Sequence, residues 1–260
     1  MRLPLFPLHA VLCPGIALPL HIFEERYREL VRYCIETSSP FGVVLIRDGH
    51  EVGGGTIAFS AIGTTAEIRK AGRYPDGRYD LLVVGTGRFA VEEVTVGEEP
   101  YIIADATLLD DEVADADEAR RLANLATRKF VRYLELLQPR EGESTDEIDI
   151  SVEVETEDAD VSEGDPGRSV AESIGEVEVE QGDETVRRRV VIPDDPTTLS
   201  YLLAGIIQIE LPRRQALLES ETTDERLRDL LELIDRETFL LRRRLRAFIP
   251  TGTTLGKRGS

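Results

Sequence analysis

The spacing of apolar residues changes near residue 110 from a strand pattern to a helical pattern, and this change limits the possible folds most strongly. Between residues 41 and 109, short runs rich in Val, Ile and Thr alternate with turn residues, which is typical of β-strands. From about residue 115, apolar residues recur every three or four positions, which indicates amphipathic helices. One earlier helix is predicted over residues 23–36. The order of these patterns predicts an α+β fold, with a β-rich part followed by a helical part.

The β-rich part is divided by recognisable turns. Tyr74-Pro75-Asp76-Gly77 is a turn in which Pro presets one backbone angle and Gly accepts a positive φ, and Gly85-Thr86-Gly87 predicts a second reversal. Many short strands around one helix are typical of a small, partly closed barrel, here called a pseudo-barrel. The predicted strands cover residues 2–8, 42–47, 56–62, 64–70, 78–84, 89–96 and 101–109.

The helical part carries start and stop signals that predict a bundle. Asp195 before Pro196 is a typical N-cap with proline at the first helical position, and Thr222 with Glu225 forms a capping box. The predicted helices cover residues 115–138, 197–209 and 211–218, and a long helix from 222 that ends before Pro250. We therefore divide the chain into a pseudo-barrel at 1–110, a helical part at 111–250 and a flexible tail at 251–260.

An acidic insertion, residues 141–192, interrupts the helical part. The whole chain has a formal net charge of −19, and residues 141–184 contain 18 acidic side chains against one basic residue, Arg168. Such a chain is poorly suited to binding nucleic acid. Two interpretations of the insertion stay open. Residues 176–180 could pair with 186–191 as a β-hairpin, or the insertion could remain solvated because like charges repel.

The sequence lacks the usual signatures of catalysis and of cofactor binding. Residues 252–258 only approximate a nucleotide-binding loop, since one residue is missing between the glycines and Arg258 replaces the expected Ser or Thr. No Gly-x-Ser-x-Gly elbow or Ser-Lys dyad is recognisable, and the spacing of His9 and Cys13 does not complete a zinc site. We therefore expect a non-enzymatic protein with no metal and no cofactor.

Composition also predicts the cellular setting. The apolar N-terminal run contains four prolines, which break the helix that a signal peptide requires, and no apolar stretch is long enough to span a membrane. We expect a cytoplasmic protein without membrane contact, in which Cys13 and Cys34 stay reduced in the core.

One histidine lies in an informative setting. His21 is flanked by apolar residues at the junction into the first helix. Its ring could contact a ligand, or it could fix the corner between loop and helix by hydrogen bonds. The sequence favours the second interpretation.

Several motifs, in order, resemble the N-terminal substrate-binding domain of ATP-dependent Lon proteases. The similarity covers about residues 1–138 and 193–248, and its later part resembles stand-alone bacterial Lon-domain proteins. The N-terminal motifs are Leu3-Pro4-Leu5-Phe6-Pro7-Leu8, Pro14-Gly15, and Leu18-Pro19-Leu20-His21-Ile22-Phe23-Glu24 followed by Arg26-Tyr27. The resemblance implies a β pseudo-barrel with one packed helix, followed by a helical bundle. It implies no catalytic residue, and no ATPase or protease domain is recognisable in this chain.

The resemblance and the residue patterns together predict a non-catalytic module that binds unfolded polypeptide or a protein partner such as a protease. The motif corner supplies the candidate binding residues His21, Phe23, Arg26 and Tyr27. Exposed strand edges and an apolar groove between barrel and bundle would suit an extended segment. The alternatives are a regulatory or scaffold protein that acts through its acidic insertion, and a small-ligand binder or enzyme with an unrecognised pocket. The patterns do not predict an oligomeric state.

Overall fold

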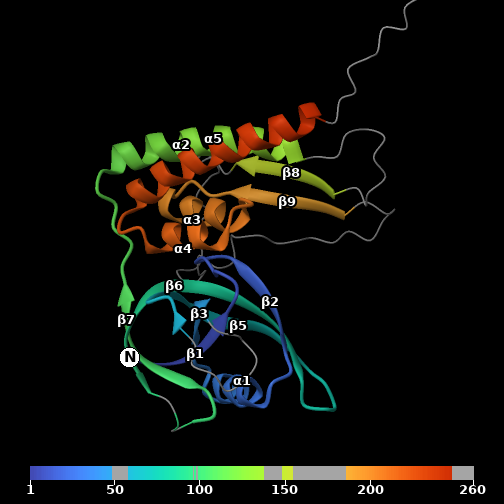
Figure 1. The fold of residues 1–260 in the computed structure, drawn as a ribbon, viewed down its shortest axis with the longest axis vertical. Coiled ribbons are helices and arrows are strands. Elements are labelled where there is room, and N and C mark those ends of the chain that lie inside the picture. The colour runs from blue at the N-terminus through green and yellow to red at the C-terminus, as the bar shows by residue number, and fades with distance from the viewer. Residues whose placement is uncertain (49–57, 96, 98, 138–147, 155–185, 248–260) are drawn as a thin grey trace, which may run out of the picture.

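The computed structural model describes residues 1–48, 58–95, 97, 99–137, 148–154 and 186–247. The fold is α+β, with a mostly antiparallel sheet at one end of the molecule and most of the helices at the other (Figure 1). The strands of the large sheet are β1 (Arg2–Leu8), β2 (Ala17–Ile22), β3 (Phe41–Asp48), β4 (Ala58–Phe59), β5 (Ile62–Arg73), β6 (Tyr79–Thr95) and β7 (Ile102–Leu109). The helices are α1 (Glu25–Thr37), α2 (Ala116–Leu137), α3 (Pro196–Ile206), α4 (Leu211–Glu219) and α5 (Thr223–Ala247).

The large sheet closes into a barrel. Strands β1, β7, β6, β5 and β3 are hydrogen-bonded in that order, and β3 pairs back to β1 in parallel. The other pairings are antiparallel. Strand β2 pairs with the first half of β6, and β4 pairs with β3. Closure removes the free edges of the five ring strands, so β2 and β4 supply the sheet edges.

Helix α1 covers the end of the barrel that lies away from the other helices (Figure 1). Its buried side chains belong to the same apolar cluster as Phe6, Phe41 and Val83 of the strands. Those buried helix residues are Tyr27, Leu30, Val31 and Cys34. Because they recur at three and four positions, one face of α1 points into the barrel while the opposite face stays in solvent.

Two local sequence signals are confirmed. The Tyr74–Gly77 turn connects β5 to β6, and Gly77 has the positive φ of 86° that glycine permits. Asp195 caps α3, with its carboxylate accepting a hydrogen bond of 2.7 Å from the Thr198 backbone N–H.

The reversal predicted at Gly85–Gly87 is wrong, because β6 runs without interruption from Tyr79 to Thr95. A register shift in the β5–β6 pairing accommodates the glycines, and the Gly87 N–H donates a 3.0 Å hydrogen bond to Thr65 Oγ1. A Cβ atom on Gly85 would lie 2.5 Å from the carbonyl oxygen of Cys13. Glycine is therefore required here for close backbone packing rather than for a turn.

The helices surround an apolar core that extends to the barrel. This core contains Phe130 and Tyr133 of α2, Leu203 of α3 and Leu230 of α5, together with Cys13 from the barrel part. Helices α2 and α5 lie side by side (Figure 1). Both cysteines are free and buried, as expected for reduced core residues. Within the described chain, no helix is both long and apolar enough to cross a membrane.

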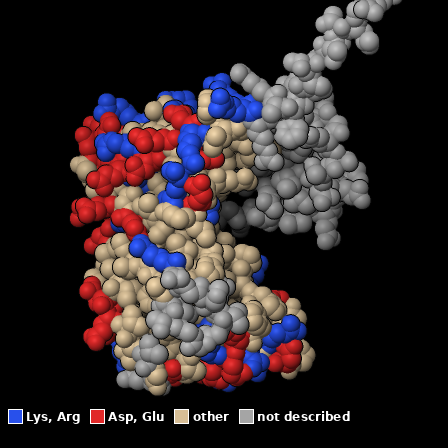
Figure 2. Space-filling view, viewed as in Figure 1, with Lys and Arg blue, Asp and Glu red and all other residues tan. Residues whose placement is uncertain are grey.

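The described part of the acidic insertion consists of two strands. Strands β8 (Ile148–Val154) and β9 (Val186–Ile192) pair in parallel, with Asp149 opposite Arg187 in the register. Residues 176–180, the first arm of the predicted hairpin, lie outside the described residues. On the face drawn in Figure 2, acidic and basic side chains are interspersed over the helical part.

Candidate functional site

The predicted corner residues His21 and Phe23 lie at the surface, where β2 ends and the chain turns into α1. His21 stands opposite Asp80 of β6 in the strand register, and its Nδ1 atom is 2.6 Å from the Asp80 carboxylate. The Phe23 side chain has 55% of its surface exposed. Apolar rings of this size are normally buried, whereas this one lies at the surface.

A third ring, Tyr74, completes this surface from the β5–β6 turn. The ring centroid of His21 is 6.3 Å from that of Phe23 and 6.3 Å from that of Tyr74. Tyr74 is 41% exposed, and the guanidinium of Arg78 lies over its ring. We call His21, Phe23 and Tyr74 the aromatic corner.

Asp80 holds two of these rings in place. Tyr74 donates a hydrogen bond from its hydroxyl to the Asp80 carboxylate, and His21 contacts the other carboxylate oxygen. The hydrogen bond from Tyr74, followed by that from His21, lowers the pKa of Asp80 below its usual value, and the same carboxylate raises the pKa of Tyr74. Asp80 is therefore ionised at neutral pH and Tyr74 keeps its proton, which preserves the bond between them.

The other two predicted residues have architectural positions. Tyr27 is buried and stacks on Phe6 of β1 with a centroid distance of 4.2 Å. Arg26 lies over the Tyr27 ring and donates from Nε to Glu24 at 3.0 Å. These contacts fix the start of α1 against the barrel. Of the predicted set, His21 and Phe23 are therefore exposed, Arg26 is partly exposed and Tyr27 is buried.

The sequence patterns did not identify Tyr74 and Asp80 as site residues. Both lie more than 50 positions beyond His21, and only the antiparallel pairing of β2 with β6 brings them alongside it. The sequence predicts the Tyr74–Gly77 turn, but it does not predict that this turn lies beside the corner. That proximity depends on the strand register.

Strand β2 gives this surface a sheet edge. It pairs with β6 on one side, and its other side pairs with no strand in the described ranges. Pro19 lies within it, and proline in a sheet is confined mainly to edge strands. An extended polypeptide can add to such an edge by backbone hydrogen bonds while its side chains contact the neighbouring rings.

The described residues contain no group of three or more His, Cys, Asp or Glu side chains placed to hold a metal ion. Burial raises the pKa of the Cys13 thiol to about 11 and that of Cys34 to about 12. Both thiols are therefore protonated at neutral pH and unsuited to act as nucleophiles.

A cleft of about 380 Å³ lies where the barrel meets α4, which corresponds in place to the predicted groove. Gln215 in this cleft donates to the Ile62 carbonyl at 3.0 Å, and Arg47 pairs with Glu219 at 3.1 Å. Its lining residues are Leu45, Ile46, Arg47, Leu211, Pro212, Gln215 and Glu219. The cleft is thus lined by apolar side chains and by polar groups that already bind protein partners.

The family model for the substrate-binding domain of ATP-dependent protease La (Lon) matches residues 2–236. Lon protease 2 of Myxococcus xanthus is 24% identical over 92% of this chain, and Lon protease of Anaeromyxobacter dehalogenans is 25% identical over 92%. The chain spans 24% of the length of each.

Two solved structures share the fold. The Lon N-terminal domain protein from Xanthomonas campestris superposes with a TM-score of 0.55 at 24% identity, covering 89% of this chain and 98% of that one. The N-terminal domain of Mycobacterium avium complex Lon protease superposes with a TM-score of 0.52 at 14% identity, covering 90% of this chain and 98% of that one. With the family model matching nearly the whole described fold, the chain belongs to the Lon substrate-binding domain family.

Proposed function

We propose that this chain is a non-catalytic binding module that holds unfolded polypeptide at the aromatic corner. The observation that carries this proposal is the run of exposed rings beside the β2 edge. Unfolded chains expose both apolar side chains and unpaired backbone groups, and folded proteins expose few of either. A surface that offers rings next to a strand edge can engage both features together.

The family supports the same function. Its model is described as a substrate-binding domain, and the relatives reported above are named as proteases. We therefore propose that a bound polypeptide is passed to a protease, and that this chain contributes recognition rather than cleavage. The absence of a recognisable nucleotide loop or Ser-Lys dyad in the sequence supports this division of labour.

Replacing Phe23 with serine should weaken the binding of unfolded polypeptide by about tenfold, because a contact ring contributes on the order of 1.5 kcal/mol when it is buried. The measurement is a fluorescence anisotropy titration of labelled, reduced and carboxymethylated α-lactalbumin, which cannot refold. Phe239→Ser on α5 is the matched control, because Phe239 is 57% exposed and Phe23 is 55% exposed. Equal affinities for the two variants would contradict the assignment of the site.

Ionic strength separates this proposal from a scaffold that acts through the acidic insertion, 141–192. Contacts made through rings and backbone groups change little with salt. Binding through a strongly acidic segment should weaken steeply between low and physiological salt, since added ions screen exposed charges. The same titration at two salt concentrations makes the distinction.

A further inference from the structure

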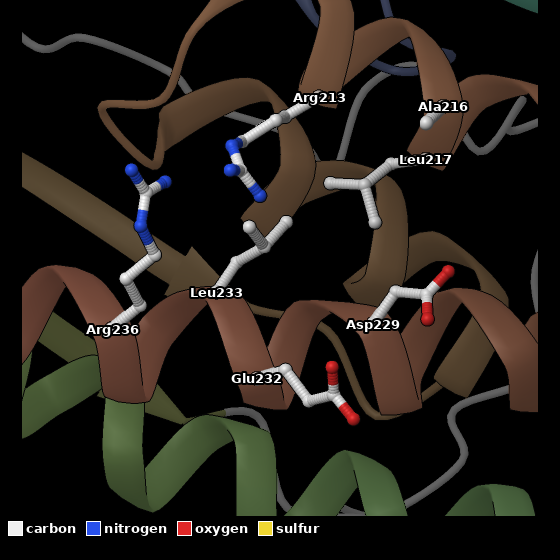
Figure 3. Close-up of a pocket in the computed structure, with 7 residues that line it drawn as sticks. All are labelled: Arg213, Ala216, Leu217, Asp229, Glu232, Leu233 and Arg236. Carbon is white, nitrogen blue, oxygen red and sulfur yellow. The ribbon is translucent and has the colours of Figure 1, made fainter.

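A second cavity, of about 290 Å³, lies between α4 and α5. It is distant from the aromatic corner, because α5 and the β5–β6 turn lie at opposite ends of the molecule (Figure 1). Figure 3 shows two guanidinium groups at one end of this cavity, two carboxylates at the other and leucine side chains between them. The lining residues are Arg213, Ala216, Leu217, Asp229, Glu232, Leu233 and Arg236.

The guanidinium end is already neutralised by the protein. Glu210 receives a 2.7 Å hydrogen bond from Arg213 Nε, and its carboxylate is 3.6 Å from Arg236. Glu237 lies 3.3 Å from the same Arg236 nitrogen. The hydrogen bonds from these two arginines, first Arg213 and then Arg236, lower the pKa of Glu210. An anionic ligand would have to displace carboxylates that are in place.

The carboxylate end has no such partner. Asp229 and Glu232 are both exposed, and neither forms an ion pair with any basic residue in the described ranges. The nearest basic residue along α5, Arg228, pairs with Glu118 of α2 instead. Burial, followed by the nearby charges of Glu232 and Glu225, raises the pKa of Asp229. This end of the cavity therefore favours a cation.

The centre of the cavity is apolar. Leu217 is almost completely buried, Leu233 is partly buried, and both contribute to the core beneath α4 and α5. A ligand that fits must combine an apolar stem with a cationic head. Among protein side chains, arginine has this form, with a stem that packs on apolar groups and a planar group that can bind two carboxylates.

We propose that the α4–α5 cavity binds an arginine side chain of a polypeptide partner, with its stem against Leu217 and Leu233 and its guanidinium at Asp229 and Glu232. This site goes beyond the proposed function, because it lies on a different face from the aromatic corner. It would recognise a positively charged side chain, whereas the aromatic corner contacts unfolded polypeptide through its rings. A partner that carries arginine would gain a second anchor on the helical part.

The test uses N-acetyl-arginine methylamide as the probe and the full chain labelled with ¹⁵N. Titration should shift backbone amide signals of α4 and α5 around Arg213–Leu217 and Asp229–Arg236. N-acetyl-citrulline methylamide has nearly the same shape without the charge, and it should leave these signals in place. Shifts of equal size with citrulline, shifts confined to other elements, or no shifts up to the solubility limit of the probe would overturn the proposal.

Variants define the residues involved. Asp229→Asn combined with Glu232→Gln should lower the affinity for the arginine probe by about fivefold. This is the value expected for losing about 1 kcal/mol of ion pairing. Glu92→Gln combined with Glu135→Gln changes the net charge equally at exposed positions on β6 and α2, and it should retain the affinity. An equal loss in both double variants would overturn the site. Phe23→Ser should bind the probe normally, which separates this result from that for the aromatic corner.

Discussion

Replacing Arg226 with alanine is expected to lower the free energy of unfolding by about 3–5 kcal/mol, because truncating a large, fully buried side chain leaves a cavity and buried acceptors without their donor. The side chain is completely buried, which is rare for arginine. Its Nε donates to the Leu217 carbonyl at 3.0 Å, and its other nitrogens bind Ser200 Oγ at 3.0 Å and the Asp111 carboxylate at 3.3 Å. Its guanidinium also lies 4.0 Å from the centroid of the Tyr201 ring.

Arg226 matters for the whole molecule because it shares Asp111 with Arg88. Arg88 comes from β6, is 3% exposed, and binds Asp111 at 3.0 Å. It also donates to the carbonyl of Leu218 at 3.1 Å and that of Ser220 at 2.6 Å, at the end of α4. Two arginines and one carboxylate thus connect the barrel to the helices. Removing Arg226 takes this donor away from the Leu217 carbonyl and from Ser200 Oγ, both buried.

Chemical denaturation followed by circular dichroism measures this effect, with Arg228→Ala as the matched control. Arg228 is two positions away on α5, is about half exposed, and pairs with Glu118 at 3.7 Å. An exposed pair of this kind contributes at most about 1 kcal/mol. A loss for Arg226→Ala no larger than that for Arg228→Ala would show that the buried network does not stabilise the fold.

Replacing Gly63 with alanine is expected to lower the free energy of unfolding by about 1–3 kcal/mol, because the barrel has no room for one more carbon. A Cβ atom on Gly63 would lie 2.5 Å from the Val43 carbonyl oxygen, 2.7 Å from Val44 Cγ1 and 2.8 Å from Phe89 Cζ. The carbonyl belongs to backbone that pairs with β5, so it cannot move without disturbing the β3–β5 ladder. The effect is measured as a shift in the midpoint of chemical denaturation. The dependence of the unfolding free energy on denaturant concentration should stay the same.

The control for this substitution lies in the same strand. A Cβ atom on Gly72 would have its nearest neighbour, the Asp80 carbonyl oxygen, 3.8 Å away, which is ordinary contact. Gly72→Ala should therefore be neutral or slightly stabilising, because alanine restricts the unfolded chain. Equal destabilisation at the two positions would contradict the close packing described for Gly63.

Features set by neighbouring residues could be predicted from the sequence. The Asp195 cap and the Tyr74–Gly77 turn follow from side chains within four positions of one another, and both are present. The change from strands to helices near residue 110 follows from apolar spacing alone. Strand β2 was missed, because a proline and a histidine obscure its alternation.

Features that depend on pairing between distant segments were not predictable. Gly85–Gly87 has the composition of a turn, and only the barrel shows why a continuous strand needs glycine there. From the sequence alone, Arg88 and Arg226 would be expected at the surface. In the fold, both bind Asp111 and backbone carbonyls of α4. The aromatic corner likewise depends on the register that sets His21 beside Asp80 and Tyr74.

Site-specific photo-crosslinking tests the binding role most directly. Phe23 is replaced by p-benzoylphenylalanine, which keeps an aromatic ring at the corner, and the protein is irradiated with carboxymethylated α-lactalbumin. Phe239 carries the same group in the control, with nearly equal exposure on α5. The account predicts crosslinked product from position 23, competed by unlabelled unfolded chain and not by native α-lactalbumin. No product from position 23, or equal product from position 239, would contradict the aromatic corner as the site where polypeptide binds.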